Sequence, residues 1–307
     1  MKKIIMWAMA AALLCGCEKE LLSDAANGGE DAEAVVTQKT KKFTFTVKGD
    51  FGSPTFSWPD GDTSGTVTRG YLLADGKDMT DLYVFDFVGD QCVNSVHQDD
   101  NTAEDFGRPV MNLALGSHHI YFVASRGDTP TLNTETNTIT WTTVRDTFWK
   151  DYEVTVTNTS NGNRAVTLDR VATKLKLTVD DEVPTGCATI LVTPDTRYNG
   201  LNYSTGAPVE MLQTSTTQEI TVPSSYIGTT GGLILSIFSL SSSTEWTTGV
   251  SIVAKDGNNS VIGSAAIDDV PLKANRVTEY HGNLFVSGGT MSTSLNSEWL
   301  TAVTGVW

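Results

Sequence analysis

The stretch that best predicts the fold is Lys42-Phe43-Thr44-Phe45-Thr46-Val47-Lys48. Polar and apolar residues alternate through it with a period of two, as they do on a β-strand with one buried face. Phe43, Phe45 and Val47 therefore share one side of the expected strand and are candidates for the core.

The segment after this strand is expected to be a long loop. Residues 49–65 are rich in Gly, Pro, Asp and Ser, which favour turns and irregular structure. The loop leads to Arg69-Gly70, where an arginine follows small polar residues in a segment expected to be open to proteases. Two interpretations stay open, a cleavage position for a protease of trypsin-like specificity and an arginine in an ordinary surface loop.

The segment before the strand is expected to be a tether. Residues 17–41 mix acidic residues with Gly and Ala and show almost no apolar periodicity. Such a composition cannot bury enough apolar surface to offset the entropy of ordering. The acidic residues resemble a signal for export to the cell surface, and they also suit a tether that is merely well solvated.

The N-terminus resembles the signal of a bacterial lipoprotein. Two lysines precede the apolar run Ile4–Leu14, which is too short to span a bilayer as a helix. Gly16 then supplies the small residue that a lipoprotein signal peptidase requires before the cysteine that is acylated, Cys17. We therefore expect residues 1–16 to be removed and Cys17 to carry the lipid. The alternative is an ordinary secretory signal in which Cys17 is incidental.

Beyond residue 80, short runs of apolar and β-branched residues follow one another closely. Nearly continuous apolar runs predict central strands at 82–88 and 118–124, and the clean alternation at 171–179 marks a restart that places a domain boundary near Asp169-Arg170. Further strands are expected at 92–98, 111–115, 153–158, 164–168, 188–193, 218–222, 233–240, 250–254, 261–267 and within 276–286, and a short helix within 141–149. This pattern indicates an all-β fold with one sandwich over residues 42–169 and a second over 170–287.

The tail, residues 288–307, has an unusual apolar row. Five large apolar residues are spaced by four, namely Met291, Leu295, Trp299, Val303 and Trp307. On a strand all five share one face, whereas the intervening Ser, Thr and Gly disfavour a helix. The tail is therefore expected to be a strand that needs a groove to fill.

Composition and motifs exclude several classes of function. Asp and Glu outnumber Lys and Arg by 36 to 21, for a net charge of −15, which disfavours binding to a nucleic-acid backbone. The sequence lacks the nucleophile-elbow, P-loop and zinc-protease motifs, and Asp60-Gly61-Asp62 lacks the glutamate of a calcium loop. His118 and His119 are adjacent on an expected strand, so they point to opposite faces and cannot share a metal. No enzyme activity, cofactor or metal is expected.

Two further features leave alternatives open. After removal of the signal and acylation of Cys17, Cys92 and Cys187 are the remaining cysteines, and they form either one disulfide or, more simply, two buried single thiols. Arg126-Gly127-Asp128 is the tripeptide that integrin ligands display on loops, and it also suits a turn after a strand.

Taken together and in order, the motifs resemble the fimbrillins of Bacteroidales, the subunits of type V pili and their anchor and tip homologues. The resemblance covers nearly the whole chain after the signal. It rests on the lipobox at Cys17, the Thr68-Arg69 junction, Asp81–Phe87, Gly116–Ala124, the restart at Leu168–Leu175, and Pro271–Thr278 before Gly282–Phe285.

The resemblance implies a fold and a mechanism. The fold would be two tandem transthyretin-like β-sandwich domains. The lipidated precursor would reach the cell outer membrane, and an arginine-specific protease would cut between Arg69 and Gly70. The strand with Phe43, Phe45 and Val47 would then leave, and the tail 291–307 of another subunit would replace it by β-augmentation. The chain would be exposed on the cell surface and in the fimbrium, in contact with other pilus subunits and with a host protein or glycan as ligand.

Two alternatives to a stalk subunit remain. An anchor or tip subunit would keep its lipid, and an anchor would escape cleavage at Arg69. A glycan-binding surface lipoprotein would also combine a lipobox with β-sandwiches, and Trp58, Trp141, Trp149 and Trp246 would be its candidate sugar platform. Core packing is the competing role for most of these aromatic side chains.

Overall fold

The computed structural model describes residues 39–49, 71–72, 79–210, 216–286 and 291–298. Within these ranges the regular structure is β-strand apart from one 3₁₀ turn at Ser224–Tyr226, so the expected all-β fold is confirmed. No helix of the described residues is long and apolar enough to cross a membrane. The predictions for Gly16, Cys17, Arg69, Gly70, Trp58, Trp299, Val303 and Trp307 lie outside these residues.

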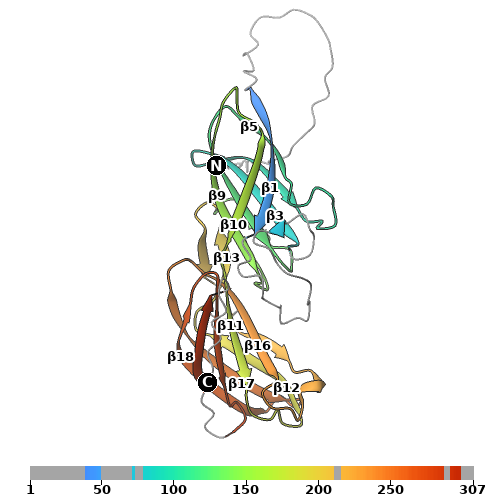
Figure 1. Ribbon diagram of the computed structural model, residues 1–307. Helices are drawn as coiled ribbons and strands as arrows, with labels where there is room; N and C mark the ends of the chain where they lie inside the picture. The colour runs from blue at the N-terminus through green and yellow to red at the C-terminus, as the bar shows by residue number, and fades with distance from the viewer. Residues whose placement is uncertain (1–38, 50–70, 73–78, 211–215, 287–290, 299–307) are drawn as a thin grey trace, which may run out of the picture. The chain divides into compact units, whose positions relative to one another are not determined.

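The first half of the fold is one continuous path of paired strands. Their order is β2-β1-β10-β9-β6-β3-β4, with β5 also paired to β1 (Figure 1). The bounds are β1 Thr40–Gly49, β2 Tyr71–Leu72, β3 Asp81–Val88, β4 Gln91–Gln98, β5 Val110–Ala114, β6 Gly116–Ser125, β9 Thr147–Val156 and β10 Asn163–Arg170. Strand β10 connects two parts of this path, because only its last residues, Asp169 and Arg170, pair with β9.

One apolar core lies between two groups of strands. Strand β1 and its neighbours β5 and β10 form one side, and strands β9, β6 and β3 form the other. The members from β1 are Phe43, Phe45 and Val47, and they meet Leu82, Val84, Ile120, Phe122, Phe148, Val166 and Leu168. These residues occupy alternate positions of their strands, as the period-two pattern predicts for a sheet with one buried face.

The second half consists of two four-stranded sheets around its own core. The sheet orders are β16-β11-β19-β20 and β15-β12-β17-β18. The bounds are β11 Ala172–Val179, β12 Cys187–Pro194, β15 Gln218–Thr221, β16 Leu233–Leu240, β17 Trp246–Asp256, β18 Val261–Leu272, β19 Arg276–Gly282 and β20 Met291–Glu298. The strand expectations for this half are confirmed, with Leu175, Leu177, Ile190, Ile252 and Tyr280 among the buried residues.

The two halves repeat one pairing that the sequence did not reveal as a repeat. In the first half, β1 pairs in parallel with β10, and in the second half, β11 pairs in parallel with β19. In each case a strand at the start of the half lies beside a strand near its end. Parallel neighbours cannot be joined by a tight hairpin. In each half, the chain therefore forms other strands after the first member of the pair and before the second.

A third four-stranded sheet, called the third sheet below, joins segments from both sides of residue 169. It has the order β14-β13-β8-β7, with β7 Thr131–Asn133, β8 Thr138–Thr140, β13 Tyr198–Asn202 and β14 Ala207–Glu210. Strand β8 pairs with β13 between Thr138–Thr140 and Gly200–Asn202. The sequence did not predict these four short strands. Residues from Gln38 onward form one compact unit, and the expected division at Asp169-Arg170 stays a prediction.

The helix expected within residues 141–149 is wrong. Residues 141–146 form turns and bends, and β9 begins at Thr147 and pairs with β6 along its whole length. Trp141 and Val144 are buried in the core shared with the third sheet instead of forming one face of a helix. Apolar residues three and four apart are therefore a weak helix signal here, because tertiary pairing overrides local propensity.

Burial of Tyr203 leads to a prediction for alkaline pH. Its ring stacks on Phe85 with the centroids 3.9 Å apart, and its hydroxyl donates to Asn137 Oδ1 at 3.0 Å. Burial, with a smaller contribution from Cys92, raises the pKa of Tyr203 to about 12. The folded state thus holds this proton more tightly than the unfolded state, so stability is lost as the pH rises from about 10 towards about 12.

The measurement is an absorbance titration of phenolate formation in the folded protein. Tyr203→Phe should remove one phenol that ionises near pH 12 and should leave the amplitude of phenolate formation at lower pH unchanged. Loss of amplitude near pH 10 in this variant would contradict the prediction.

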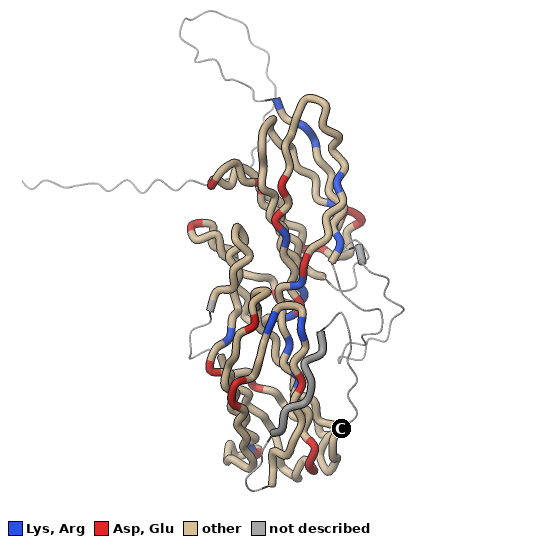
Figure 2. The backbone as a smooth tube through the Cα atoms, turned by 60° about the vertical axis from the view of Figure 1, so that its left-hand side comes forward, with Lys and Arg blue, Asp and Glu red and all other residues tan. Residues whose placement is uncertain are grey.

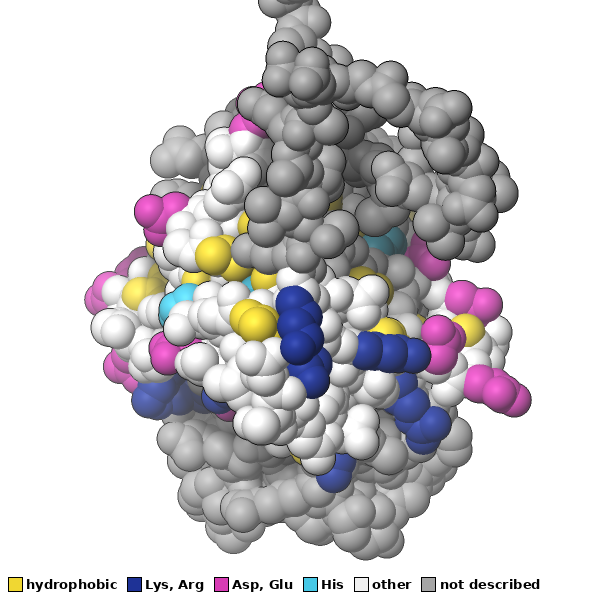
Figure 3. Space-filling view, turned by 90° about the horizontal axis from the view of Figure 1, so that it is seen from above, with side chains coloured by type: hydrophobic (Ala, Val, Ile, Leu, Met, Phe, Trp, Pro, Cys, Tyr) yellow, Lys and Arg dark blue, Asp and Glu magenta, His cyan; other side chains and the backbone are white. Residues whose placement is uncertain are grey.

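Figure 2 shows Lys and Arg interspersed with Asp and Glu along the tube. The face visible in Figure 3 shows no broad apolar patch among the described residues. Hydrophobic side chains on the face visible in Figure 3 are scattered between polar ones. The exposed large hydrophobic residues of the described ranges come from separate strands and loops, namely Val88, Val93, Val110, Leu132, Ile234, Val261 and Val286.

Candidate functional site: the first strand and its flanks

Strand β1 is hydrogen-bonded to neighbours on both of its edges. On one edge, residues 44–49 pair in parallel with β10 from Asn163 to Leu168. On the other edge, residues 40–44 pair with β5, and the Phe45 and Val47 N–H groups donate to the carbonyls of Pro109 and Gly107 at 3.0 and 2.9 Å. The expected strand is confirmed, and its removal would leave two rows of unpaired backbone groups.

The apolar side chains of β1 are completely buried. Phe43, Phe45 and Val47 are each 0% exposed, whereas the residues between them are half-buried. The Phe45 ring meets Phe122 edge-on with the centroids 5.3 Å apart and Tyr152 at 6.1 Å. The three side chains predicted for the leaving strand are therefore the part of β1 that anchors it in the core.

Gly162 allows β1 to approach the end of the β9–β10 connection. The Thr44 N–H donates to the Gly162 carbonyl at 2.7 Å. A Cβ at position 162 would collide with the backbone carbonyl oxygen of Lys42. A glycine is needed here because neighbouring backbone, not a flexible side chain, occupies the space.

The expected cleavage loop lies in sequence between β1 and β2, and these two strands pair with each other. Gly49 at the end of β1 pairs with Tyr71 of β2, and Lys48 pairs with Leu72. Arg69 and Gly70 lie outside the described residues and immediately precede β2 in sequence. The only covalent link from β1 forward to the remaining fold therefore passes through residues 50–70.

The first part of the expected donor tail is a strand of the chain's own second sheet. Strand β20 pairs antiparallel with β19, from Arg276 opposite Glu298 to Gly282 opposite Met291. It ends the order β16-β11-β19-β20 and is an edge strand. The choice of a strand over a helix is confirmed for residues 291–298, which include Met291 and Leu295.

The described tryptophans do not come together as the candidate sugar platform of the glycan-binding alternative. Trp141 is 1% exposed in the core beside the third sheet. The Trp149 Nε1–H donates to the Tyr203 carbonyl at 2.8 Å, and a Cβ on Gly206 would collide with its ring. Trp246 belongs to a different part of the fold, at the start of β17.

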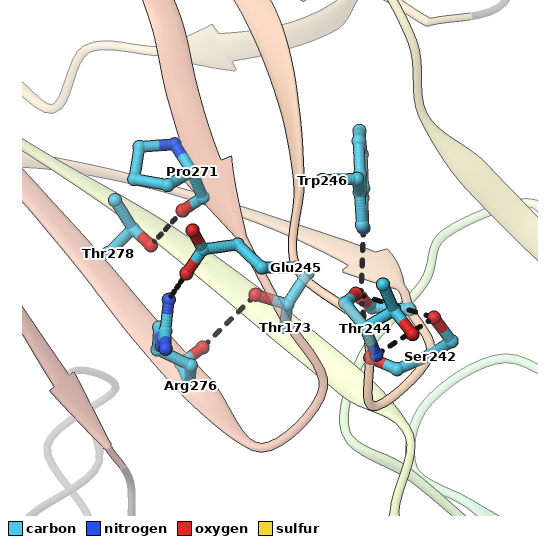
Figure 4. A network of polar contacts seen from close by, with 9 residues as sticks. Thr173, Ser242, Thr244, Glu245, Trp246, Pro271, Arg276 and Thr278 are labelled. Atoms are coloured by element: carbon cyan, nitrogen blue, oxygen red, sulfur yellow. Dashed lines mark hydrogen bonds and ion pairs between the residues drawn. The ribbon is translucent and has the colours of Figure 1, made fainter.

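Trp246 takes part in a polar network beside β19, shown in Figure 4. Its Nε1–H donates to Ser241 Oγ at 2.9 Å, and Glu245 next to it pairs with Arg276. Thr173 Oγ1 donates to the Arg276 carbonyl at 3.1 Å, so the network connects the loop before β17 with β11 and β19. The indole N–H is already satisfied within the protein, which favours a structural role for this tryptophan.

The Arg-Gly-Asp tripeptide forms a turn after β6. Gly127 has φ +108°, and its carbonyl accepts from Thr80 Oγ1 at 3.1 Å. Gly127 and Asp128 are exposed, but Asp128 Oδ2 accepts a hydrogen bond from the Thr143 N–H at 3.1 Å. The aspartate therefore stabilises the turn itself.

The adjacent histidines have opposite environments, as the strand pattern predicts. His118 faces the first core, with Nδ1 2.7 Å from Asp86 Oδ1 and Nε2 2.9 Å from the Ala114 carbonyl. Burial raises the pKa of Asp86, while its hydrogen bond to His118 opposes the shift. His119 lies on the other side of β6, with Nδ1 at 3.1 Å from Asp151 Oδ1.

The two described cysteines are not joined by a disulfide. Cys187 is buried at the start of β12, as expected, and burial raises the pKa of its thiol. Cys92 is exposed on β4, so the expectation of two buried thiols is wrong for this residue. Its strand is an edge of the sheet, where one face is open to water.

Sequence reasoning missed a buried ion pair at the junction of the halves. Arg170 Nε and Nη2 donate to the two carboxylate oxygens of Asp146 at 2.7 and 3.0 Å, and both side chains are 1% exposed. Arg170 Nη1 also donates to Asn275 Oδ1 at 3.1 Å. The available signal was an arginine at the edge of an apolar run, but nothing in the spacing identifies its partner 24 residues away.

Comparisons with known proteins give structural similarities only. No family model matches the chain, and no curated protein matches it. A "putative adhesin" from Bacteroides ovatus is similar over 80% of this chain and 88% of its own, with 12% identity and a TM-score of 0.47. A "putative cell adhesion protein" from Bacteroides uniformis is similar over 84% and 98%, with 15% identity and a TM-score of 0.46.

A third solved structure has a different description. The "putative polysaccharide binding proteins" from Bacteroides thetaiotaomicron are similar over 80% of this chain and 92% of theirs, with 9% identity and a TM-score of 0.44. Because each of these three identities is 15% or lower and each of the three TM-scores is below 0.5, these similarities assign neither a family nor a function to the chain.

Proposed function

We propose that the chain is a structural subunit of a type V-like fimbria that assembles by protease-triggered strand exchange and contributes to cell adhesion. It is exported as a lipoprotein through Cys17 and reaches the outer membrane before assembly. Its partners are other subunits of the same pilus and an arginine-specific protease that cuts between Arg69 and Gly70. It acts by assembly and not by catalysis.

The observation that carries the proposal is the position of β1. Its three apolar side chains are fully buried, and both of its edges are hydrogen-bonded. After a cut at Arg69, only these contacts would hold β1 in place, because residues 50–70 are its forward covalent link. Its departure would expose apolar pockets and unpaired backbone together, which is the surface that an incoming strand satisfies.

The tail is the proposed incoming strand. The proposed donor is the tail 291–307. Its residues 291–298 pair with β19 of the same chain, and residues 299–307 lie outside the described residues. Trp299, Val303 and Trp307 would share one face of such a strand. Because they are spaced by four residues and Phe43, Phe45 and Val47 by two, at most two of them would enter the pockets that these three side chains leave.

The test uses the purified protein after limited digestion with an arginine-specific protease. Wild-type protein should be cut after Arg69 and should then form multimers on size-exclusion chromatography. Arg69→Ala should stay uncut and monomeric. Trp299→Asp should be cut but should not multimerise, because its charge would enter an apolar pocket.

Three outcomes would contradict the proposal. Multimers of Arg69→Ala would show that cleavage is not the trigger, and multimers of cut Trp299→Asp would show that the tail is not the donor. A first cut at another site, with Arg69 protected, would remove the proposed cleavage position. An N-terminus at Cys17 with the lipid retained on protein taken from assembled fimbriae would instead identify an anchor subunit.

A further inference from the structure

The outer faces of β6 and β9 bring His119 together with two acidic side chains, the first of which is 32 residues later in the sequence. His119 on β6 lies directly opposite Glu153 on β9 in the strand register, and Asp151 is two residues before Glu153 on the same face. One ligand atom from each of the three residues lies within 4.8 Å of the other two. Within the described residues, no second group of three such side chains meets this spacing.

The cluster has two carboxylates and one imidazole, so a bound cation would balance its negative charge. His119 Nδ1 lies 3.1 and 3.2 Å from the two oxygens of Asp151. Glu153 is exposed, and it has no Lys or Arg in ion-pair contact among the described residues. One imidazole therefore faces two carboxylates, and the basic residue next to Asp151 in sequence, Lys150, pairs with Asp169 instead.

The surrounding side chains are aromatic or acidic. Phe87 of β3 lies opposite His119 on the other edge of β6, and Tyr121 follows His119 on the same face. Asp90, in the turn between β3 and β4, adds a third carboxylate whose charge acts on Tyr121 together with Asp151 and Glu153.

We propose that His119, Asp151 and Glu153 form a binding site for one divalent transition-metal ion such as Zn²⁺. Imidazole and carboxylate ligands bind zinc at about 2.0–2.2 Å, so ligand atoms in a tetrahedral site lie about 3.4 Å apart. Small side-chain rotations contract the observed spacing to this value. Three protein ligands leave a fourth position for water or for a group on a partner, because the site is open to solvent.

The choice of metal follows from the ligands. A cluster of carboxylates alone would favour hard cations such as Ca²⁺ and Mg²⁺, which take six or more oxygen ligands. The imidazole nitrogen of His119 favours zinc and its neighbours in the transition series. Site formation requires no change in the strands, because β6 and β9 are paired along the whole segment.

The test is a calorimetric titration of tag-free, metal-stripped protein with Zn²⁺ alone. We expect one ion per chain, and a loss of affinity of at least about 10-fold in both His119→Ala and Glu153→Gln. Glu153→Gln keeps the contact of His119 with Asp151. A loss of Zn²⁺ affinity in this variant would therefore show that Glu153 is itself a ligand. The d–d absorbance of bound Co²⁺ should disappear in the same variants.

The chain offers a matched control in His281→Ala. His281 Nδ1 lies 2.6 Å from Asp180 Oδ2, and the side chains of this pair are 35% and 40% exposed, against 41% and 31% for His119 and Asp151. It is a surface histidine–aspartate pair that belongs to no group of three among the described residues, so its variant should bind Zn²⁺ as the wild type does. Thermal unfolding in the presence of a chelator should confirm that all variants are folded.

Several results would overturn the assignment. Absence of Zn²⁺ binding, unchanged binding in His119→Ala, or equal losses in His119→Ala and His281→Ala would each do so. Displacement of Zn²⁺ by an equal concentration of Ca²⁺ would show a carboxylate site in which His119 is not a ligand.

Discussion

Replacement of Arg170 by Met is expected to lower the free energy of unfolding by about 3–5 kcal/mol, because it leaves the Asp146 carboxylate buried without its bidentate partner. Both side chains are 1% exposed, with N–O distances of 2.7 and 3.0 Å. Burial already raises the pKa of Asp146 despite the opposing charge of Arg170, so loss of the guanidinium should raise it further.

The measurement is chemical denaturation at several pH values. An aspartate whose pKa is raised in the folded state binds its proton more tightly than in the unfolded state, so its destabilising effect develops as the pH rises above about 3.9. The deficit of Arg170→Met should therefore shrink as the pH is lowered. A deficit that stays constant with pH would show lost packing instead of an uncompensated charge.

Two controls separate the pair from its surroundings. The double variant Arg170→Met with Asp146→Leu should recover much of the lost stability, because an apolar pair of similar volume replaces a buried ion pair at little cost. Lys150→Met breaks the exposed pair with Asp169 at 2.8 Å and should cost about 0–1 kcal/mol.

Phe45→Ala is expected to lower the free energy of unfolding by about 3–5 kcal/mol. The Phe45 ring is 0% exposed and meets both Phe122 and Tyr152 edge-on, so truncation creates a cavity between β1 and the β6–β9 pair. Backbone pairing of β1 with β10 and β5 should keep the strand in place, which limits how far the surroundings can collapse into that cavity.

The matched control for this prediction is Thr46→Ala. Thr46 is the next residue of the same strand and is half-buried on its other face, so its change should cost less than about 1 kcal/mol. Urea denaturation midpoints with unchanged slopes provide the comparison. Equal effects of the two substitutions would show that β1 contributes through its backbone and not through its apolar face.

The sequence by itself determined the strands that have a regular pattern of apolar residues. Alternation at 42–48 and 171–179 placed β1 and β11, and the continuous apolar runs placed β3 and β6, because side chains of a strand point alternately to two faces. The same rule separated His118 from His119 and indicated that residues 291–298 are a strand. Local chemistry was sufficient for each of these features.

Pairing between distant strands was decided only by the tertiary structure. The short strands β7, β8, β13 and β14 have too few residues to show a period, and they exist because β8 and β13 pair across 60 residues of chain. The parallel pairing of β1 with β10 likewise has no local signal.

Candidate sites depend on the same long-range pairing. The sequence named Phe43, Phe45 and Val47, because an apolar face is a local property. It did not reveal Asp146 with Arg170, or His119 with Asp151 and Glu153. Polar side chains become partners when strand register brings them together, and register is set by burial along the whole sheet and not by the identity of the polar residues themselves.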